Sequence, residues 1–543
     1  MAARRALSSY DILTEIFEYF SLARSAGIWD RLDSTFALVK CARVSKAFSD
    51  IALDILWRDL YGLLPLFQLF SSFVKDVGPD EPPDDWEEAE PMDEPEQYSD
   101  YLNGTITPEE WTVFEKYARR VRTLTYYGGS SVALDDVLHY HRAHFGDRPV
   151  LPRLHEFSWR PSYALDTNIR HLFSQSFRRV TIAFQDDSHG QGQDHDLQEV
   201  LDALSHQAPL LEEFRIRDFG RPFLLRPLLT RCGRLRKLAI LGFAKILDRQ
   251  FFVFLSALPY LEELWISCEH IHMKPVTLAS LHALFKLKIS GIIAQIVSVL
   301  EIISCPNIHT LDITNTQVDS SPHDLVQLME LVWSSSGTSL HSIFYSNAGS
   351  FIGDESLLDL VRPLLQTPRL QFVDLQFGLG PWGLPDTDVR DIASAWPELR
   401  SFRLSADKSS SRPELYPIGR MPSMGSLAIF AQLCPSLVKL ALPFIVDSGY
   451  SNSDESHWTT SHSLQELDID YICPPGIRNP SQTAQFLDSI FPNLDIPLSF
   501  QQTSLAYLLL EDFECIHPII YRRHEGWGTV AQLMEELQTA RTE

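Results

Sequence analysis

Apolar residues in the first sixty positions fall into stripes with the spacing of amphipathic helices. In residues 7–20 the apolar positions recur at steps of one, three and four: Ile12, Leu13, Ile16, Phe17 and Phe20. After a polar insert two further stripes follow: Leu38, Val39, Cys41, Ala42 and Val44, then Phe48, Ile51, Ala52, Ile55, Leu56 and Trp57. This is more apolar surface than three short helices can bury among themselves, so we expect a partner helix to complete the core.

A different pattern begins at Val121, where the arrangement apolar-x-x-apolar-x-apolar starts to recur. It is found as VRTLTY, LHEFSW, FRRVTI, LEEFRI, LRKLAI, LEELWI, LFKLKI, IHTLDI, LHSIFY, LQFVDL, LRSFRL, LVKLAL and LQELDI. These segments begin at positions 121, 154, 177, 211, 235, 261, 284, 308, 340, 370, 399, 437 and 464, and a degenerate unit begins at Leu494. Such recurrence predicts a solenoid, in which each unit buries its apolar face only by stacking on its neighbours.

Each recurring segment predicts a short strand, because its alternate apolar residues can face one side of a sheet. Helical runs such as 251–258 and 324–333 lie between the segments. The expected fold class is α/β, with a parallel sheet on the inner face of the solenoid and helices on the outside. An amphipathic helix at 532–541 is expected to close the last open face.

Charge and cysteine content narrow the range of partners and compartments. With 46 Lys and Arg against 71 Asp and Glu, the net charge is −25, which argues against a general binder of nucleic acid or anionic membranes. Twelve acidic residues and five prolines lie between Asp76 and Asp100, where we expect a solvated linker. The seven cysteines stand apart and no apolar run is long enough to span a bilayer, so a cytoplasmic or nuclear location is expected.

One segment has the spacing of a nucleotide-binding motif. Residues 378–383 read GLGPWG, which matches the glycine pattern of a dinucleotide fingerprint. That motif needs free amides at a helix N-terminus, whereas Pro381 removes one amide and the next helix is expected near Asp386. We therefore expect no cofactor and no enzymatic activity.

Histidines and cysteines offer no clearer site. His139, His141 and His144 are too loosely spaced for a metal site and are expected on the surface. Three cysteines recur with the repeat and are expected in its core: Cys232, Cys305 and Cys434. No metal is expected.

Two parts of the chain resemble known families. The N-terminal segments DILTEIFEYF, LVKCARVSKAF and LDILWRDL resemble the three helices of the F-box, in that order. The recurring segments, with a cysteine three residues ahead at 232, 305 and 434, resemble irregular leucine-rich repeats whose asparagine ladder is missing except at Asn315. An F-box followed by such repeats is similar to the substrate receptors of cullin ubiquitin ligases, especially those of mushroom-forming fungi.

The resemblance implies a non-catalytic receptor that binds a Skp adaptor, and through it a cullin. It divides the chain into an F-box at 7–60, a docking helix and acidic linker at 61–108, a solenoid at 109–510 and a capping segment at 511–543. The F-box residues that it assigns to the adaptor are Ile12, Leu13, Ile16, Phe17, Leu38, Val39, Val44, Phe48, Leu56 and Trp57.

Charged side chains flank the last two apolar positions of each recurring segment, where they should face away from the core. In the units that begin at 154 to 284, seven of these are basic and three acidic, whereas acidic residues are in excess later. We therefore expect the inner face to bind an acidic or phosphorylated client segment, with aromatic anchors. The candidate residues are Arg179, Arg215, Arg217, Lys237, Trp265, Lys286, Lys288 and Phe344.

Other interpretations stay open at this point. The N-terminal helices could be an ordinary cap on the repeats, and the charges could be merely solvated. The chain could also be a repeat scaffold that assembles proteins without ubiquitin transfer. Binding of a Skp adaptor would separate a ligase subunit from such a scaffold.

Overall fold

The computed structural model forms two compact units, Met1–Gly242 and Phe243–Glu543. It describes residues 10–20, 28–74, 101–128, 132–146, 148–161, 165–184, 194–217, 222–242, 249–268, 279–317, 319–347, 350–351, 356–377, 383–406, 420–447, 462–470, 472–473, 476–500 and 526–542. The acidic segment Asp76–Asp100 and most of the GLGPWG segment lie outside the described residues.

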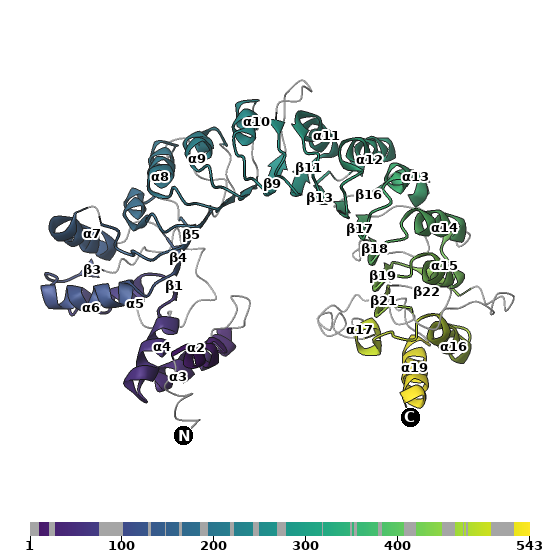
Figure 1. Cartoon of the computed structure of the whole chain (residues 1–543), viewed down its shortest axis with the longest axis horizontal. Helices are drawn as coiled ribbons and strands as arrows, with labels where there is room; N and C mark the ends of the chain where they lie inside the picture. The colour runs from purple at the N-terminus through teal and green to yellow at the C-terminus, as the bar shows by residue number, and fades with distance from the viewer. Residues whose placement is uncertain are drawn as a thin grey trace, which may run out of the picture. The chain divides into compact units, whose positions relative to one another are not determined.

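Three helices begin the first unit, as the apolar stripes predict, and we call them the head: α2 (Tyr10–Glu18), α3 (Ile28–Ala42) and α4 (Lys46–Leu56). The hydroxyl of Ser45 accepts a hydrogen bond from the Phe48 amide at 3.3 Å and so caps α4. Helix α3 starts inside the polar insert, earlier than the stripe from Leu38 indicates. The head lies beside the first strand of the unit (Figure 1).

Parallel strands follow the head in the order β1-β4-β5-β6-β7-β8. Their bounds are Asp59–Tyr61, Thr123–Tyr127, Glu156–Arg160, Arg179–Ala183, Glu213–Arg217 and Lys237–Leu241. All but β1 coincide with recurring segments, and β1 pairs with β4 through Leu60 opposite Leu124. The sequence pattern does not predict this first strand.

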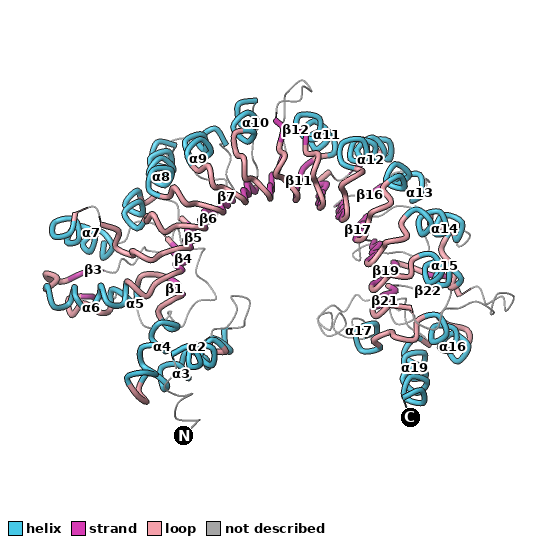
Figure 2. The backbone as a smooth tube through the Cα atoms, in the orientation of Figure 1, coloured by secondary structure: helices cyan, strands magenta, loops and turns pink. Residues whose placement is uncertain are grey.

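Helices connect these strands and cover one side of the sheet within the unit (Figure 2). They are α5 (Leu64–Phe67), α6 (Pro108–Ala118), α7 (Val132–Phe145), the 3-10 helix η1 (Thr167–Leu172), α8 (Asp194–Gln207), η2 (Pro222–Leu225) and α9 (Arg226–Arg231). A short antiparallel pair, β2 (Phe73–Val74) and β3 (Tyr101–Leu102), flanks the acidic segment. Helix α6 has Thr107 as its cap and Pro108 in its first turn.

The second unit repeats the arrangement with strands in the order β9-β11-β13-β15-β17-β18-β19-β21. Their bounds are Glu263–Cys268, Lys286–Gly291, Thr310–Asn315, Ser342–Asn347, Phe372–Phe377, Ser401–Ala406, Lys439–Leu442 and Glu466–Ile469. Short parallel pairs form between β10 (Ala279–Ser280) and β12 (Ile303–Ser304), β14 (Asp319–Ser320) and β16 (Ser350–Phe351), and β20 (Ile445–Val446) and β22 (Ile472–Cys473).

Helices again line one side of the strands in this unit (Figure 2). They are α10 (Arg249–Ser256), α11 (Ile293–Ile302), α12 (Pro322–Ser336), α13 (Leu357–Val361), η3 (Arg362–Gln366), α14 (Asp386–Ala395), α15 (Gly425–Leu433), α16 (Pro480–Ile490), α17 (Ile496–Phe500) and α19 (Trp527–Thr542). The start of α14 at Asp386 confirms the prediction. Helix α19 packs on α16 and α17, with Met534 fully buried.

The recurring pattern correctly predicts the core of both units. The first apolar residue of every recurring segment, from Val121 to Leu464, is at most 2% exposed. Within the strands buried and exposed residues alternate, as in β9, where Leu264 and Ile266 are buried and Glu263 and Trp265 face outward. Each buried side chain contributes roughly 1.5–3 kcal/mol to the stability of the fold, and a repeat buries its side chains only by contact with the neighbouring repeats.

The asparagine ladder has one more member than the sequence analysis finds. The Asn315 side-chain amide donates to Asn347 Oδ1 at 2.9 Å, and both side chains are buried. Asn315 Oδ1 also accepts from the Gln317 amide at 3.1 Å. Two neighbouring repeats are thus joined by buried polar contacts in addition to their apolar core.

Candidate interaction surfaces

The helices of the head share a small core of their own. Its buried side chains are Leu13, Phe17, Leu38, Ile51, Ala52 and Ile55, against which Phe20, Cys41, Ala42, Phe48 and Leu56 pack. Phe17 and Phe48 meet edge-on, with ring centroids 5.3 Å apart. Three residues that the F-box resemblance assigns to the adaptor, Leu13, Phe17 and Leu38, are therefore buried within the head itself.

A second set of apolar residues in the head stays exposed. Ile12 and Ile16 are 44% and 43% exposed and share one face of α2. Val39 and Val44, near the junction of α3 and α4, are 44% and 67% exposed. Phe36 of α3 is also exposed and was missed by the sequence analysis. Of the predicted adaptor residues, Ile12, Ile16, Val39 and Val44 are thus the ones most accessible to a partner.

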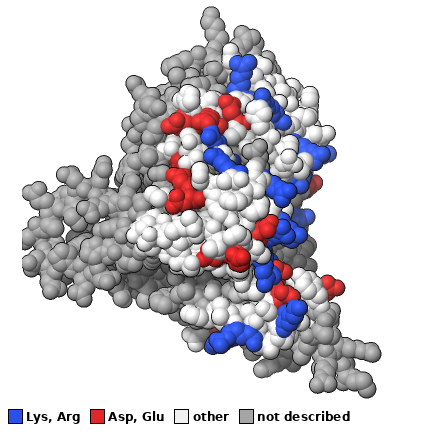
Figure 3. Space-filling view, turned by 90° about the vertical axis from the view of Figure 1, so that its left-hand side faces the viewer, with Lys and Arg blue, Asp and Glu red and all other residues white. Residues whose placement is uncertain are grey.

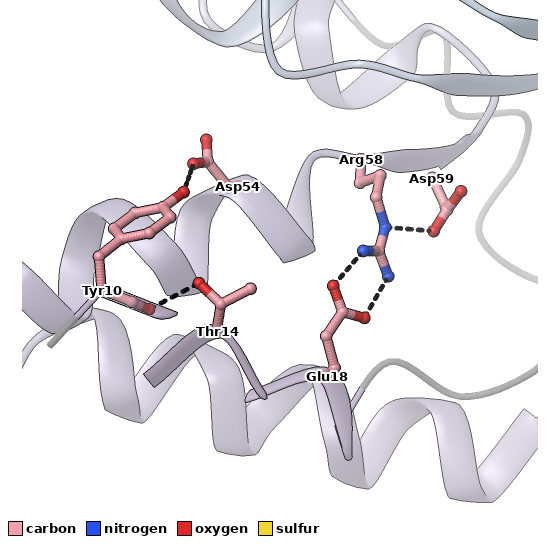
Figure 4. Close-up of polar contacts among 6 residues, drawn as sticks. All are labelled: Tyr10, Thr14, Glu18, Asp54, Arg58 and Asp59. Atoms are coloured by element: carbon pink, nitrogen blue, oxygen red, sulfur yellow. Dashed lines mark hydrogen bonds and ion pairs between the residues drawn. The ribbon is translucent and has the colours of Figure 1, made fainter. Parts of the chain in front are cut away.

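Arg58 fastens the head to the sheet (Figure 4). Its guanidinium donates to both carboxylate oxygens of Glu18 on α2, at 2.5 and 3.1 Å, and to Asp59 at 3.2 Å. The hydrogen bond with Glu18 raises the pKa of Arg58 although burial opposes it. The Arg58 carbonyl accepts from the amides of Arg122 and Thr123, at 2.8 and 2.9 Å, which begins the ladder between β1 and β4. One residue therefore joins α2 to the first strands.

Helix α6 supplies a second attachment. Arg120, just after this helix, donates to the Asp50 carbonyl at 2.9 Å and forms an ion pair with Asp54, both on α4. The rings of Trp57 and Tyr117 are in contact, tilted by 36° with centroids 4.5 Å apart. The predicted adaptor residue Trp57 is thus engaged on the side of the repeats.

The outward face of the strands in the first unit carries the predicted charges, but Arg179 pairs with a residue of the neighbouring strand and Arg215 with a residue of its own strand. Arg179 lies 3.1 Å from Glu156, and Arg215 lies 2.5 Å from Glu213. Arg217 extends from the end of β7 into solvent. Lys237 lies opposite Glu213 in the register of β7 and β8. Positive and negative side chains are therefore interspersed along this face, and fewer of its cations are unpaired than the residue count suggests.

In the second unit the register brings one outward residue from each of six strands into a single row. We call it the central row: Trp265, Lys288, Asp312, Phe344, Asp374 and Arg403. The Lys288 ammonium lies 4.6 Å from the Trp265 ring centroid and 2.8 Å from Asp312. The row thus alternates aromatic and ion-paired side chains, while Lys286 lies at the exposed start of β11.

Two phenylalanines are exposed on this otherwise polar face. Phe344 is 37% exposed between Asp312 and Asp374, and Phe372 on the next strand is 39% exposed. Burial raises the pKa of Asp374, and the nearby Asp312 adds to this, while Arg403 at 4.0 Å opposes it. The prediction that Phe344 faces away from the core is confirmed, while the other aromatic candidate, Trp265, is half-buried.

In the described part of the chain, no three His, Cys, Asp or Glu side chains are placed to hold a metal ion. Burial raises the pKa of Cys232 to about 11 and of Cys305 and Cys434 to about 12, which keeps these thiols protonated and unreactive. Within the same residues, no helix has both the length and the apolar character needed to cross a membrane.

The prediction of a surface position is wrong for His141. It is 6% exposed and packs against Trp111 and Phe145, with ring centroids 5.4 and 5.6 Å apart. Its position completes the buried stripe of α7 that Leu134 and Leu138 begin, at the i, i+4, i+7 spacing. This stripe could have been read from the sequence. Burial is also the main reason that the pKa of His141 is lowered.

The sequence analysis missed another set of residues, those directly before each strand. They include Arg122, His155 and Arg178 in the first unit and His309 and His341 in the second, where the two imidazole rings stack at 5.0 Å. Each occupies the second position of its recurring segment. Comparing that position across the repeats would have revealed the row.

The architecture defines a class of protein. Short parallel strands, a buried apolar residue at each fixed position and a connecting helix recur through both units. The chain is an α/β solenoid of the leucine-rich-repeat type, with a helical head at its N-terminus.

Comparisons with known proteins add a similarity of fold. No protein-family model matches the sequence, and a comparison with curated proteins finds no relative. The TLR13–ssRNA13 complex is similar at 16% identity, over 68% of this chain and 50% of that chain, with a TM-score of 0.33. The leucine-rich repeat-containing protein LegL7 from Legionella pneumophila is similar at 13% identity, over 57% of this chain and 94% of that one, with a TM-score of 0.32.

A leucine-rich repeat protein of Leptospira interrogans is similar at 10% identity, over 61% of this chain and 92% of that one, with a TM-score of 0.23. The chain spans about half the length of the TLR13 chain that it matches. At these identities and TM-scores we infer no partner from the similarities. The resemblance of the head to the F-box stays a prediction.

Proposed function

We propose that this protein is a non-catalytic substrate receptor of a cullin ubiquitin ligase. In this proposal the head binds a Skp adaptor and the strand face of the repeats binds a client protein. The protein contributes proximity and orientation, and other subunits perform the transfer of ubiquitin.

The exposed apolar residues of the head carry the proposal. A three-helix unit that buries Leu13 and Phe17 yet leaves Ile12 and Ile16 open has an unsatisfied apolar face. Such a face suits a partner helix laid across it, with anchors at helical spacing. The attachment through Arg58 supports the proposal too, because it holds the head firmly on the repeats.

The central row is the second element of the proposal. Phe344 and Phe372 offer flat apolar anchors, and the ion pairs around them form a polar rim that can discriminate among partners. In this proposal the preference for an acidic client comes from cations that form no ion pair among the described residues, such as Arg217 and Lys286. The client segment would lie across the strands.

Replacing two exposed residues of the head tests adaptor binding. The double variant I12E/I16E should weaken binding of a purified Skp adaptor at least tenfold, since it places carboxylates on the apolar face. Val113→Glu is a matched control, because Val113 on α6 is also 44% exposed and lies outside the head. Isothermal titration calorimetry gives the affinities, and thermal melting confirms that the variants fold.

The outcomes separate the candidate functions. If the wild-type protein does not bind the adaptor, or the double variant binds it equally well, the receptor proposal is wrong. Client capture without adaptor binding would instead support the second candidate, a repeat scaffold without ubiquitin transfer. The observation that favours this alternative is the burial of Leu13, Phe17 and Leu38 in the core of the head, because these residues are then not open to an adaptor.

A further inference from the structure

A row of basic side chains follows the edge of the sheet in the first unit, at the residues directly before the strands. The His155 amide donates to the Arg122 carbonyl, and the Arg178 amide donates to the His155 carbonyl, both at 2.8 Å. Arg122, His155 and Arg178 are therefore on adjacent rungs, about 4.8 Å apart. Arg153 lies two positions before His155 and is exposed. We call these four residues the basic edge.

Two arginines of the basic edge lack a counter-ion. Within the described residues, Arg122 and Arg153 form no hydrogen bond or ion pair through their side chains. Other cations nearby are neutralised: Arg120 by Asp54, Arg178 by Glu212 at 3.5 Å, and Arg179 by Glu156 at 3.1 Å. Asp54 acts on Arg122 only at longer range. Along this edge, the positive charge without a counter-ion is thus that of Arg122 and Arg153.

The charges around His155 agree with this geometry. Burial lowers the pKa of His155, and Arg122, Arg178, Arg153 and Arg179 each lower it further. The pKa of Arg122 is itself lowered by burial and by Arg153. On the face drawn in Figure 3, Lys and Arg follow one side in a column, with Asp and Glu between some of them. In a chain of net charge −25, neighbouring cations without counter-ions create a local positive field that attracts an anion.

We propose that the basic edge binds a phosphate monoester carried on an extended segment of a protein partner. Guanidinium groups donate paired hydrogen bonds to phosphate oxygens, and a phosphate dianion matches the two unpaired arginines. His155 gains a proton as the anion binds and becomes a further donor. The inference deepens the proposed function, since it names the chemistry of the client.

The net charge favours a phosphopeptide over a nucleic acid. A polyanion with many phosphates is repelled by the acidic remainder of the chain. A single phosphate on a peptide experiences chiefly the local field of the basic edge, because charges more than about 8 Å away are screened at physiological salt.

Nuclear magnetic resonance on the full chain with labelled histidine tests the inference. The probes are the peptide Gly-Ser-phosphoserine-Gly-Ser, its unphosphorylated form, inorganic phosphate and a short RNA. The phosphopeptide should bind at least tenfold more tightly than the unphosphorylated peptide and should raise the pKa of His155. The variant H155Q identifies the His155 signal.

The double variant R122Q/R153Q should weaken phosphopeptide binding at least tenfold. Arg119→Gln is the matched control, because Arg119 is an exposed arginine of the same unit that already pairs with Glu115. Equal binding of the two peptides, full binding by R122Q/R153Q, or tighter binding of RNA would overturn the inference. Phosphate binding without phosphopeptide binding would also overturn it, since the anion would then not be carried on a segment. Adaptor binding by the head is measured separately, so either proposal can fail alone.

Discussion

Phe344 occupies the middle of the central row, where an aromatic ring lies open between two carboxylates. Its strand neighbours Ile343 and Tyr345 are buried, so the backbone of β15 is held while the Phe344 ring remains accessible. An aromatic residue on a rigid strand loses little entropy when a partner covers it. These properties identify Phe344 as an anchor for the client.

Phe344→Ala should therefore reduce client capture without unfolding the protein. We expect a 10- to 100-fold loss of affinity, about 1.4–3 kcal/mol, while stability changes by less than about 0.5 kcal/mol. Trp333→Ala is the matched control, because Trp333 is a 39% exposed aromatic on α12 of the same unit. Quantitative mass spectrometry of co-purified proteins compares the three forms, and an unchanged set with Phe344→Ala would contradict the prediction.

For single residues, the sequence predicts which side of the sheet a side chain faces better than it predicts which residue that side chain contacts. Alternation within each recurring segment correctly separates Trp265 and Phe344 from the core. The pairing of Lys288 with Asp312 depends on register between repeats whose lengths differ, and the sequence does not fix that register. The division of the head residues into core and exposed sets depends likewise on how three helices pack.

Single elements follow from local signals when those signals are present. Helix α6 has a capping box, in which the Thr107 hydroxyl and the Glu110 carboxylate each accept from the other's backbone amide. Thr107 followed by Pro108 and by Glu110 is a sequence signature of such a helix start. Helix α3 begins in a polar insert without an apolar stripe, and β1 is only three residues long. The sequence pattern therefore predicts neither the start of α3 nor the presence of β1.

Glu110 makes the stability of this element dependent on pH. Hydrogen bonds from Ser71 and from the Thr107 amide lower the pKa of Glu110 from 4.5 to about 2. A carboxylate with a lowered pKa stabilises the folded state above its ordinary pKa, and this contribution is lost as the pH falls from about 4.5 towards 2.

Glu110→Gln should cost about 0.5–1 kcal/mol at pH 7, and the cost should shrink at pH 3 because the carboxylate then contributes less. The neighbouring Glu109→Gln should have little effect at either pH, since Glu109 lies outside the capping box. Urea midpoints at both pH values provide the measurement. A cost that stays constant between them would show that the charge of Glu110 is not responsible.

For the molecule as a whole, the ends of a repeat array decide whether its last units hold together. In the second unit α19 covers the terminal repeat, with Trp527, Val530 and Met534 buried. Gln538 donates to the Leu494 carbonyl at 2.9 Å, which joins the helix to the degenerate last unit. The predicted helix at the C-terminal end is confirmed. The period of the apolar pattern also correctly predicts the stack of repeats whose last member this helix covers.

Met534→Asp should loosen the C-terminal repeats by several kcal/mol, because it buries an unpaired charge. Hydrogen exchange should rise in α16 and β21 while the head remains protected. Glu535→Ala, on the exposed side of the same helix, is the control. Faster exchange throughout both units would mean that α19 supports more than its own end of the array.

Arg58 gives the first unit a mechanical property of its own. Its side chain donates hydrogen bonds to α2, and its carbonyl accepts the first hydrogen bonds between β1 and β4. The head is therefore attached directly to the first repeats, without a free hinge at this point. In a receptor of the proposed kind, the reach from adaptor to basic edge would be a fixed length, and a ligase could then modify only those client lysines that this spacing presents to it.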